Sequence, residues 1–195
     1  METKMVKLKY EVKFLDYWHL SSGLSAGAKL DSTVVKDKDG FPYLSGKTLK
    51  GLAREMAEYL DNTLLLKSCF GDEGVEMGVC YFSNATLNEN IAKEIKDNAL
   101  QERLYDVIAS TKIGKEDKFK DGKQIEKKDI AVDNSLREIE VVVPVTLEGY
   151  IDDVPSDYKE EMIKALKMIK RMGLNRNRGL GRCEITVTEV IECEN

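Results

Sequence analysis

The residue types best suited to chemistry are concentrated in one short stretch near the end of the chain. Residues 172–182 contain three glycines, three arginines, two asparagines and no acidic residue. Glycine lets the backbone reach positive φ and lets another chain approach closely, and successive backbone N–H groups in such a turn can form a concave anion site. The planar guanidinium group of arginine matches the geometry of phosphate oxygens. We therefore predict a site for phosphate groups or a nucleic acid, formed by Arg176, Arg178, Gly179, Gly181 and Arg182.

A second candidate anion site lies where a helix is predicted to begin. Ser45 is the expected N-cap, and apolar residues recur at helical spacing from Leu49 to Leu60. A neighbouring stripe of this helix carries three cations, Lys47, Lys50 and Arg54. A cation in the first helical turn is unfavourable against the helix dipole, so an anion held by free N–H groups of that turn is a plausible partner. The alternative is that these side chains are simply solvated.

The elements that must position these residues follow from the apolar periodicity. Val6 to Phe14 alternate with polar residues, which predicts a strand, and residues 16–44 indicate a long irregular loop. The later predictions are a core strand at 79–85, helical structure within 88–108, a long strand at 139–151, a helix from 155 to Gly173 and a last strand from 183. Pro144 cannot donate a ladder hydrogen bond, so we expect it at an edge, bulge or bend. Without insertions the order is βαββαβ, which predicts an α+β, ferredoxin-like (RRM-like) core.

Residues 110–137 differ in composition from the rest of the chain. Lysine and acidic residues alternate there with few apolar ones, so this stretch cannot bury much surface by itself. Asp121-Gly122 is typical of a hairpin tip. We predict a protruding arm that becomes ordered on a partner, and its lysines, Lys112 to Lys128, are weaker candidates for phosphate contacts. A plain mobile insertion is the alternative.

The bulk properties limit the choice of function. A chain of 195 residues with 42% hydrophobic residues fits one domain, residues 1–195, with a substantial core. The net charge of −5 argues against indiscriminate nucleic-acid binding but permits one basic groove on an acidic body.

The four cysteines contain no CxxC pair, and we expect reduced structural thiols. Because no signal peptide or membrane-length apolar run is visible, we expect a cytoplasmic protein without a membrane partner. The aromatic signature of a standard RNA-recognition motif is missing, so RNA binding would use backbone contacts and loops.

Two segments together resemble the RAMP superfamily of CRISPR-associated proteins. Residues 30–37 and 40–54 are similar to the family block D-x-x-V … G-x-P-Y-I-P-G-[ST]-[ST]-L-K-G-x-x-R, and residues 177–182 are similar to its C-terminal glycine-rich loop. Their order, their spacing and the strand and helix context agree with the family. Ser45 stands where the family usually has proline.

The resemblance implies a function. A single core with a long arm is similar to the backbone subunit of type III effector complexes in antiviral defence. Such a subunit would polymerise with copies of itself and other effector subunits along a guide CRISPR RNA. Its thumb-like arm would kink the duplex of guide and complementary target RNA at regular intervals.

The same resemblance implies an enzymatic activity. In catalytic members an aspartate in the loop before the first helix cuts target RNA with a divalent metal, and Asp31 matches that position. The expected reaction is a metal-dependent endoribonuclease cleavage in which Asp31 is both the catalytic residue and a ligand of Mg²⁺ or another divalent cation. Substrate phosphates and waters would complete the coordination. A capping or surface role for Asp31 is the alternative.

Two other functions stay open. Ribonucleases of the same superfamily that mature CRISPR RNA can use a histidine after the first strand as a general base without metal, and His19 stands there. A packed or phosphate-facing histidine is the alternative role for this residue. The chain can also be a non-catalytic RAMP structural subunit, which shares every feature above except the role of Asp31.

Overall fold

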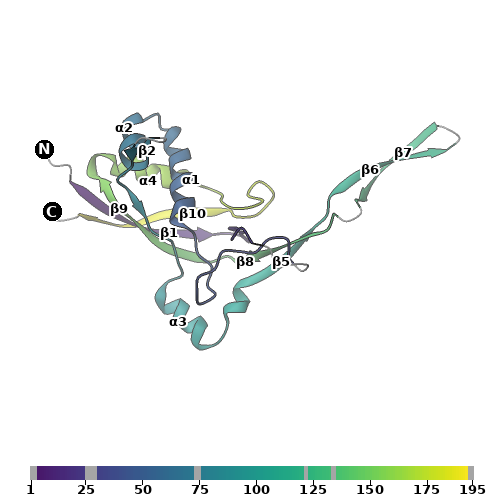
Figure 1. Ribbon diagram of the computed structural model, residues 1–195, viewed down its shortest axis with the longest axis horizontal. Helices are drawn as coiled ribbons and strands as arrows, with labels where there is room; N and C mark the ends of the chain where they lie inside the picture. The colour runs from purple at the N-terminus through teal and green to yellow at the C-terminus, as the bar shows by residue number, and fades with distance from the viewer. Residues whose placement is uncertain (1–3, 25–29, 73–75, 121–122, 133–134, 193–195) are drawn as a thin grey trace.

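The computed structural model describes residues 4–24, 30–72, 76–120, 123–132 and 135–192. Four antiparallel strands form the main sheet in the order β10-β1-β9-β4. These strands are β1 (Met5–Phe14), β4 (Tyr81–Phe82), β9 (Thr146–Pro155) and β10 (Cys183–Glu192). Helix α1 (Gly46–Glu58) follows β1 and helix α4 (Lys159–Met168) follows β9, and both lie on one side of the sheet (Figure 1). This βαββαβ order confirms the predicted α+β, ferredoxin-like core.

The core forms where the apolar face of the sheet meets the two helices. Alternate residues of β1 from Val6 to Phe14 are buried, as the period of two requires. Helix α1 buries Leu49 and Ala53 from the predicted stripe. Each large apolar side chain removed from water in this way contributes roughly 1.5–3 kcal/mol to folding. The core therefore fixes the positions of the loops that leave the ends of these elements.

Shorter elements connect the main ones. After α1 come α2 (Thr63–Leu65), the π-helical turn η1 (Leu66–Phe70) and a small hairpin of β2 (Gly71–Asp72) and β3 (Glu76–Met77). Before the arm come α3 (Glu89–Asp97) and the 3-10 turn η2 (Gln101–Leu104), and η3 (Ser156–Tyr158) leads into α4. In Figure 1, α3 lies below the sheet, away from α1, α2 and α4.

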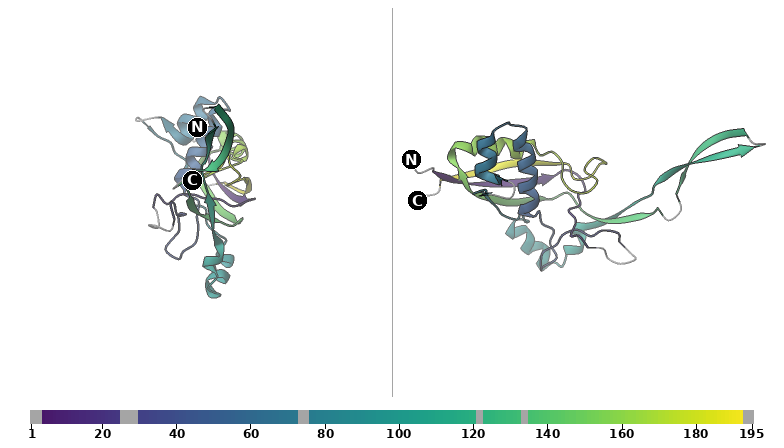
Figure 2. Two further views of the ribbon diagram at one scale, coloured as in Figure 1. Left: turned by 90° about the vertical axis from the view of Figure 1, so that its right-hand side faces the viewer. Right: turned by 45° about the horizontal axis from the view of Figure 1, so that its top comes forward.

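The predicted protruding arm is confirmed. Its root consists of β5 (Tyr105–Ser110) paired with β8 (Arg137–Val142), and its outer part consists of β6 (Ile113–Lys120) paired with β7 (Lys123–Ala131). Figures 1 and 2 show β6 and β7 extending far from the sheet. The predicted hairpin tip at residues 121–122 lies outside the described residues.

Two element predictions are wrong because long-range pairing outweighs local sequence preference. Residues 105–108, the end of the segment predicted to be helical, belong to β5, since β8 supplies a paired strand along its whole length. The helix that should end at Gly173 ends at Met168, because the residues after it pair with the start of β10.

Two other predictions are correct in kind but wrong in extent. The strand expected at 139–151 is divided into β8 and β9, and Pro144 occupies the bend between them, as its missing N–H predicts. The core strand expected at 79–85 is reduced to Tyr81–Phe82 in the sheet.

Candidate functional site

The glycine-rich loop is closed at its base and rests on the chain that follows β1. The N–H of Met172 donates to the carbonyl of Gly181 at 2.9 Å, which closes the loop. The N–H of Gly181 then donates to the carbonyl of Tyr17 at 2.8 Å, and the N–H of Leu174 donates to the carbonyl of His19 at 2.9 Å. The loop is therefore held against residues 17–19 by main-chain atoms.

Two of its glycines are required by the geometry. Gly173 has a φ of 90° and Gly181 has a φ of 70°, a region that side chains with a Cβ rarely adopt. A Cβ at Gly173 would collide with the carbonyl oxygen of His19, and one at Gly181 would collide with that of Met172. Gly173 therefore allows the loop to lie against His19, and Gly181 allows the loop to close on Met172.

The loop presents its arginines in two environments. Arg176 and Arg178 are exposed. Arg182 is also exposed, but its Nε lies 3.7 Å from Oδ2 of Asp16, and its N–H donates to Oδ1 of the same carboxylate at 2.8 Å. The N–H of Arg178 is already used in a turn with the carbonyl of Asn175 at 2.7 Å. Positive charge for an anion therefore comes mainly from the guanidinium groups rather than from the backbone.

The three cations of α1 do not share one environment. Lys47 is exposed to solvent. Nζ of Lys50 instead lies 3.4 Å from the carbonyl oxygen of Cys80, and Nε of Arg54 lies 3.5 Å from the carboxylate of Glu58. Only Lys47 therefore presents its charge outward without a described contact to another residue.

The start of α1 is also less open than the sequence indicates. Ser45 occupies the N-cap position, but its side chain makes no capping hydrogen bond, and Oδ1 of Asn84 accepts from the N–H of Gly46 at 2.9 Å instead. The expectation that this N–H is free for an anion is therefore wrong. Lys50 reaches toward the β4 edge of the sheet, whereas the glycine-rich loop leads into β10 at the other edge. A single trough shared by Lys50 and the arginines stays a prediction, and these contacts do not support it.

Asp31 lies at the root of the arm, against the first residues of β8. Its N–H donates to the carbonyl of Glu138, and its Oδ2 accepts from the N–H of Glu138, both at 2.8 Å. Its Oδ1 lies 3.9 Å from Nη1 of Arg137. The side chain is 43% exposed, so a carboxylate oxygen fixed in orientation by the backbone remains accessible from solvent.

A divalent cation would find the right type of ligand here but few of them. Mg²⁺ prefers carboxylate oxygen, which Asp31 supplies. Within the described part of the chain, no group of three or more His, Cys, Asp and Glu side chains is placed to hold a metal ion. Asp31 therefore fits a site that a substrate would complete, and not a metal cage made by protein alone.

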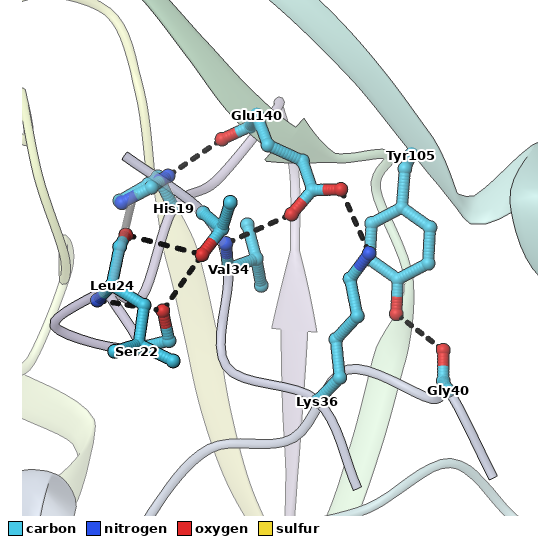
Figure 3. A network of polar contacts seen from close by, with 9 residues as sticks. His19, Ser22, Leu24, Val34, Lys36, Gly40, Tyr105 and Glu140 are labelled. Atoms are coloured by element: carbon cyan, nitrogen blue, oxygen red, sulfur yellow. Dashed lines mark hydrogen bonds and ion pairs between the residues drawn. The ribbon is translucent and has the colours of Figure 1, made fainter. Parts of the chain in front are cut away.

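A buried polar network fixes the segment that follows Asp31 (Figure 3). The carboxylate of Glu140 accepts from the N–H of Val34 at 2.9 Å and from Nζ of Lys36 at 2.8 Å. This ammonium lies 3.7 Å from the ring centroid of Tyr105, whose hydroxyl donates to the carbonyl of Gly40 at 2.6 Å. Burial, and then the nearby carboxylate of Glu140, raises the pKa of Tyr105, so its hydroxyl stays a donor.

His19 is a fully buried residue that joins the two motif-bearing segments. Its Nδ1 lies 2.6 Å from the carbonyl oxygen of Glu140, as Figure 3 shows. Its Nε2 lies 3.0 Å from Oγ of Ser32. Its own carbonyl accepts from the glycine-rich loop at Leu174. A general base must reach a substrate hydroxyl. With both nitrogens engaged in the interior, the geometry supports a packed histidine rather than a base.

Sequence reasoning missed Glu140, Lys36 and Tyr105. The alternation of Glu140 with apolar neighbours is typical of the polar face of a strand. The run of three valines from 141 to 143 is a signal of burial on both faces, and β8 is indeed buried on both sides at its end. That signal predicts a partner for the charge of Glu140 but does not identify Lys36, which lies 104 residues away.

The fold defines a ferredoxin-like protein with two insertions. One is the long loop after β1, and the other contains α3 and the arm after β4. The sequence matches the RAMP superfamily over residues 11–184, and the chain belongs to that superfamily. No curated protein matches the sequence at a significant level.

Two solved structures with similar folds come from the same kind of assembly. A chain of the type III-B Cmr-beta complex bound to cognate target RNA aligns with a TM-score of 0.67 at 17% identity, covering 97% of this chain and 61% of that one. This chain thus spans about three fifths of that relative. A chain of the apo state of type III-B Cmr-beta aligns with a TM-score of 0.64 at 13% identity, covering 94% of this chain and 97% of that one. Among the helices that the structure describes, none has the length and apolar character needed to cross a bilayer.

Proposed function

We propose that this protein is a guide RNA-binding backbone subunit of a type III CRISPR effector complex, and that it cleaves complementary target RNA at Asp31. One observation carries the proposal. The glycine-rich loop is bonded to the carbonyl of His19, and the ring of His19 is bonded to Ser32, the neighbour of Asp31. The two segments that resemble the superfamily are thus fastened to one another.

The binding part of the proposal rests on exposed positive charge on an acidic protein. Arg176, Arg178 and Lys47 are exposed, and the whole chain carries a net charge of −5. Guanidinium contacts to phosphate position a strand without reading its sequence, which suits a subunit that must accept any guide. The arm would contact the guide–target duplex, and copies of this chain with other effector subunits would be the protein partners. Such a complex would act in the cytoplasm.

The cleavage part rests on the orientation of one carboxylate. Glu138 fixes Oδ2 of Asp31, and Oδ1, which lies 3.9 Å from Nη1 of Arg137, would bind a divalent cation such as Mg²⁺. A bound cation would supply Lewis-acid stabilisation of the scissile phosphate during attack by the adjacent ribose 2′-OH. Asp31 would hold that cation at the root of the arm, and Arg137 beside it would balance the negative charge of the phosphate.

Asp31→Asn separates chemistry from structure. The amide oxygen still accepts from the N–H of Glu138, but the side chain loses the charge that a cation requires. We expect target cleavage by the assembled complex to become undetectable, while guide RNA still co-purifies with the protein. The matched control is Asp39→Asn, which removes an exposed carboxylate of the same loop that pairs with Lys96 at 2.7 Å. The control should cut at the wild-type rate.

The same assay distinguishes the alternatives. Cleavage of target that stops on addition of EDTA supports the metal-dependent reaction. Cleavage of guide precursor that continues in EDTA and is lost in His19→Ala would establish the metal-independent processing enzyme instead. Guide RNA that co-purifies without any cleavage would leave a structural subunit, and a protein that recovers no RNA would refute the RNA-binding part.

A further inference from the structure

The segment that carries Asp31 lies against β8 and is joined to it by one parallel bridge. Ser32 forms a parallel bridge with Ile139, and the N–H of Glu140 donates to the carbonyl of Ser32 at 3.1 Å. The N–H of Asp31 donates to the carbonyl of Glu138 at 2.8 Å in the same register. The other edge of β8 is occupied by β5. Asp31 is therefore aligned by the strand that returns from the arm.

The side chain of Glu140 extends the contact between β8 and this segment beyond the paired backbone atoms. Its carboxylate accepts from the N–H of Val34 and from Nζ of Lys36, as Figure 3 shows. Its side chain is only 11% exposed, and no other carboxylate belongs to a buried residue in the segments 4–24, 30–72, 76–114, 131–132 and 135–192. A buried carboxylate is tolerated only when it is paired and hydrogen-bonded. Glu140 is thus committed to these two contacts.

The backbone of Glu140 connects the same point to the glycine-rich loop. Its carbonyl accepts from Nδ1 of His19 at 2.6 Å, and His19 in turn holds Leu174. One residue of the arm root therefore contacts the Asp31 segment through its carboxylate and its N–H, and contacts the loop support through its carbonyl.

We propose that Glu140 is a positioning residue for cleavage: it locks the Asp31 segment in register with β8, so that the orientation of the arm determines where Asp31 lies. This inference rests on the proposed function. It explains why a charged residue occupies a buried position at the arm root. The coupling connects the part of the molecule that projects toward an RNA duplex with the carboxylate proposed to cut it.

The variant that tests this is Glu140→Gln. If the amide oxygen accepts from the N–H of Val34, the amide NH₂ faces the ammonium of Lys36. If the amide is flipped, its NH₂ faces the N–H of Val34. In either orientation one contact places a donor against a donor. We expect the cleavage rate constant at saturating target to fall by about tenfold to a hundredfold, because a small misplacement of a catalytic group has effects of that size. The KM for target and the recovery of guide RNA should remain at wild-type values.

A second measurement reports on position without chemistry. Hydrogen exchange of the assembled complex should show faster exchange in peptides covering residues 30–36 in Glu140→Gln, with unchanged protection of β1 and α1. Lys36→Gln removes the cation that neutralises the buried carboxylate, so it should also raise the exchange of residues 30–36. The matched control is Glu189→Gln, which makes the same chemical change at a residue of β10 that forms an exposed ion pair with Lys9 of β1. It should behave as wild type.

The outcomes separate this inference from the proposed function. If wild-type complex cuts target and Glu140→Gln cuts at the same rate with the same KM, the positioning role is wrong. If wild-type complex does not cut at all, the proposed cleavage is wrong, and hydrogen exchange alone decides whether Glu140 holds the segment. Unchanged exchange at residues 30–36 in Glu140→Gln would overturn that structural role as well. A loss of protection throughout β1 and α1 would show a general folding defect and would count against a local role.

Discussion

At the scale of single residues, the same side chain type has different functions according to its contacts. Arg182 is tied to Asp16 through both its backbone and its guanidinium group, so it contributes to holding the loop. Arg176 and Arg178 extend into solvent from the same loop. An exposed guanidinium without an acidic partner retains its full charge for a phosphate, whereas a paired one must first be released. Guide binding should therefore depend more on Arg176 and Arg178 than on Arg182.

Replacing Arg176 and Arg178 together with alanine tests this. We expect weaker guide RNA binding and a shallower dependence of the logarithm of affinity on the logarithm of salt concentration. The slope should fall by about 0.7 for each phosphate that the variant no longer neutralises. Filter binding at several salt concentrations gives both quantities. The control variant Lys93→Ala/Arg103→Ala removes two exposed cations, one in α3 and one in η2. An identical change in slope for both variants would indicate that only net charge matters.

At the scale of elements, α1 contains a glycine that the fold does not require. Gly51 lies in the interior of the helix, is exposed, and would meet no atom within 4 Å if it carried a Cβ. Glycine in a helix interior is less stable than alanine by about 1 kcal/mol. It lies one turn after the exposed Lys47, on the same face of the helix. If the proposed RNA strand lies along this face, the missing side chain lets its backbone approach the helix closely.

Gly51→Ala should therefore have opposite effects on stability and binding. We expect the free energy of unfolding of the isolated protein to rise by about 1 kcal/mol in urea titrations. Guide RNA affinity should fall in the same preparation, because the added methyl group keeps the strand away from the helix. Greater stability with unchanged affinity would place the RNA elsewhere on the surface.

The elements also show what the sequence could predict. The predictions for β1 and α1 are correct because each has a single buried face, which gives a clear period of two or 3.6 residues. The predictions for the end of α4 and for residues 105–108 are wrong, because these conformations depend on partners that lie far away in the chain. For the candidate site, the exposed arginines and Asp31 follow from residue type and resemblance. The buried partners of Glu140 do not, since no periodic pattern indicates which distant side chain neutralises a buried charge.

At the scale of the whole molecule, the outer arm and the core are separate in their contacts. β6 and β7 pair with each other, and Figures 1 and 2 show them extending away from the sheet. The core elements pack together around α1, α4 and the sheet. Folding of the core should therefore not depend on the outer arm, while interactions with a long duplex should.

Replacing residues 114–130 with a short Gly-Ser linker between Ile113 and Ala131, which pair at the base of the outer arm, tests this separation. We expect the thermal midpoint of the core to change by less than about 2 °C, a shift that corresponds to at most about 1 kcal/mol for a domain of this size. Guide RNA should still co-purify, whereas target cleavage should decrease. A large drop in the midpoint would show that the arm supports the core.

The way the glycine-rich loop is fastened has a practical consequence. Its base and its support on residues 17–19 use carbonyl and N–H groups, which every amino acid except proline supplies in full. The side chain of Asn177, which is exposed between the two arginines, can thus be exchanged while the loop scaffold is preserved. This makes the loop a suitable attachment point for a fluorescent reporter, whose signal would follow nucleotide occupancy in real time.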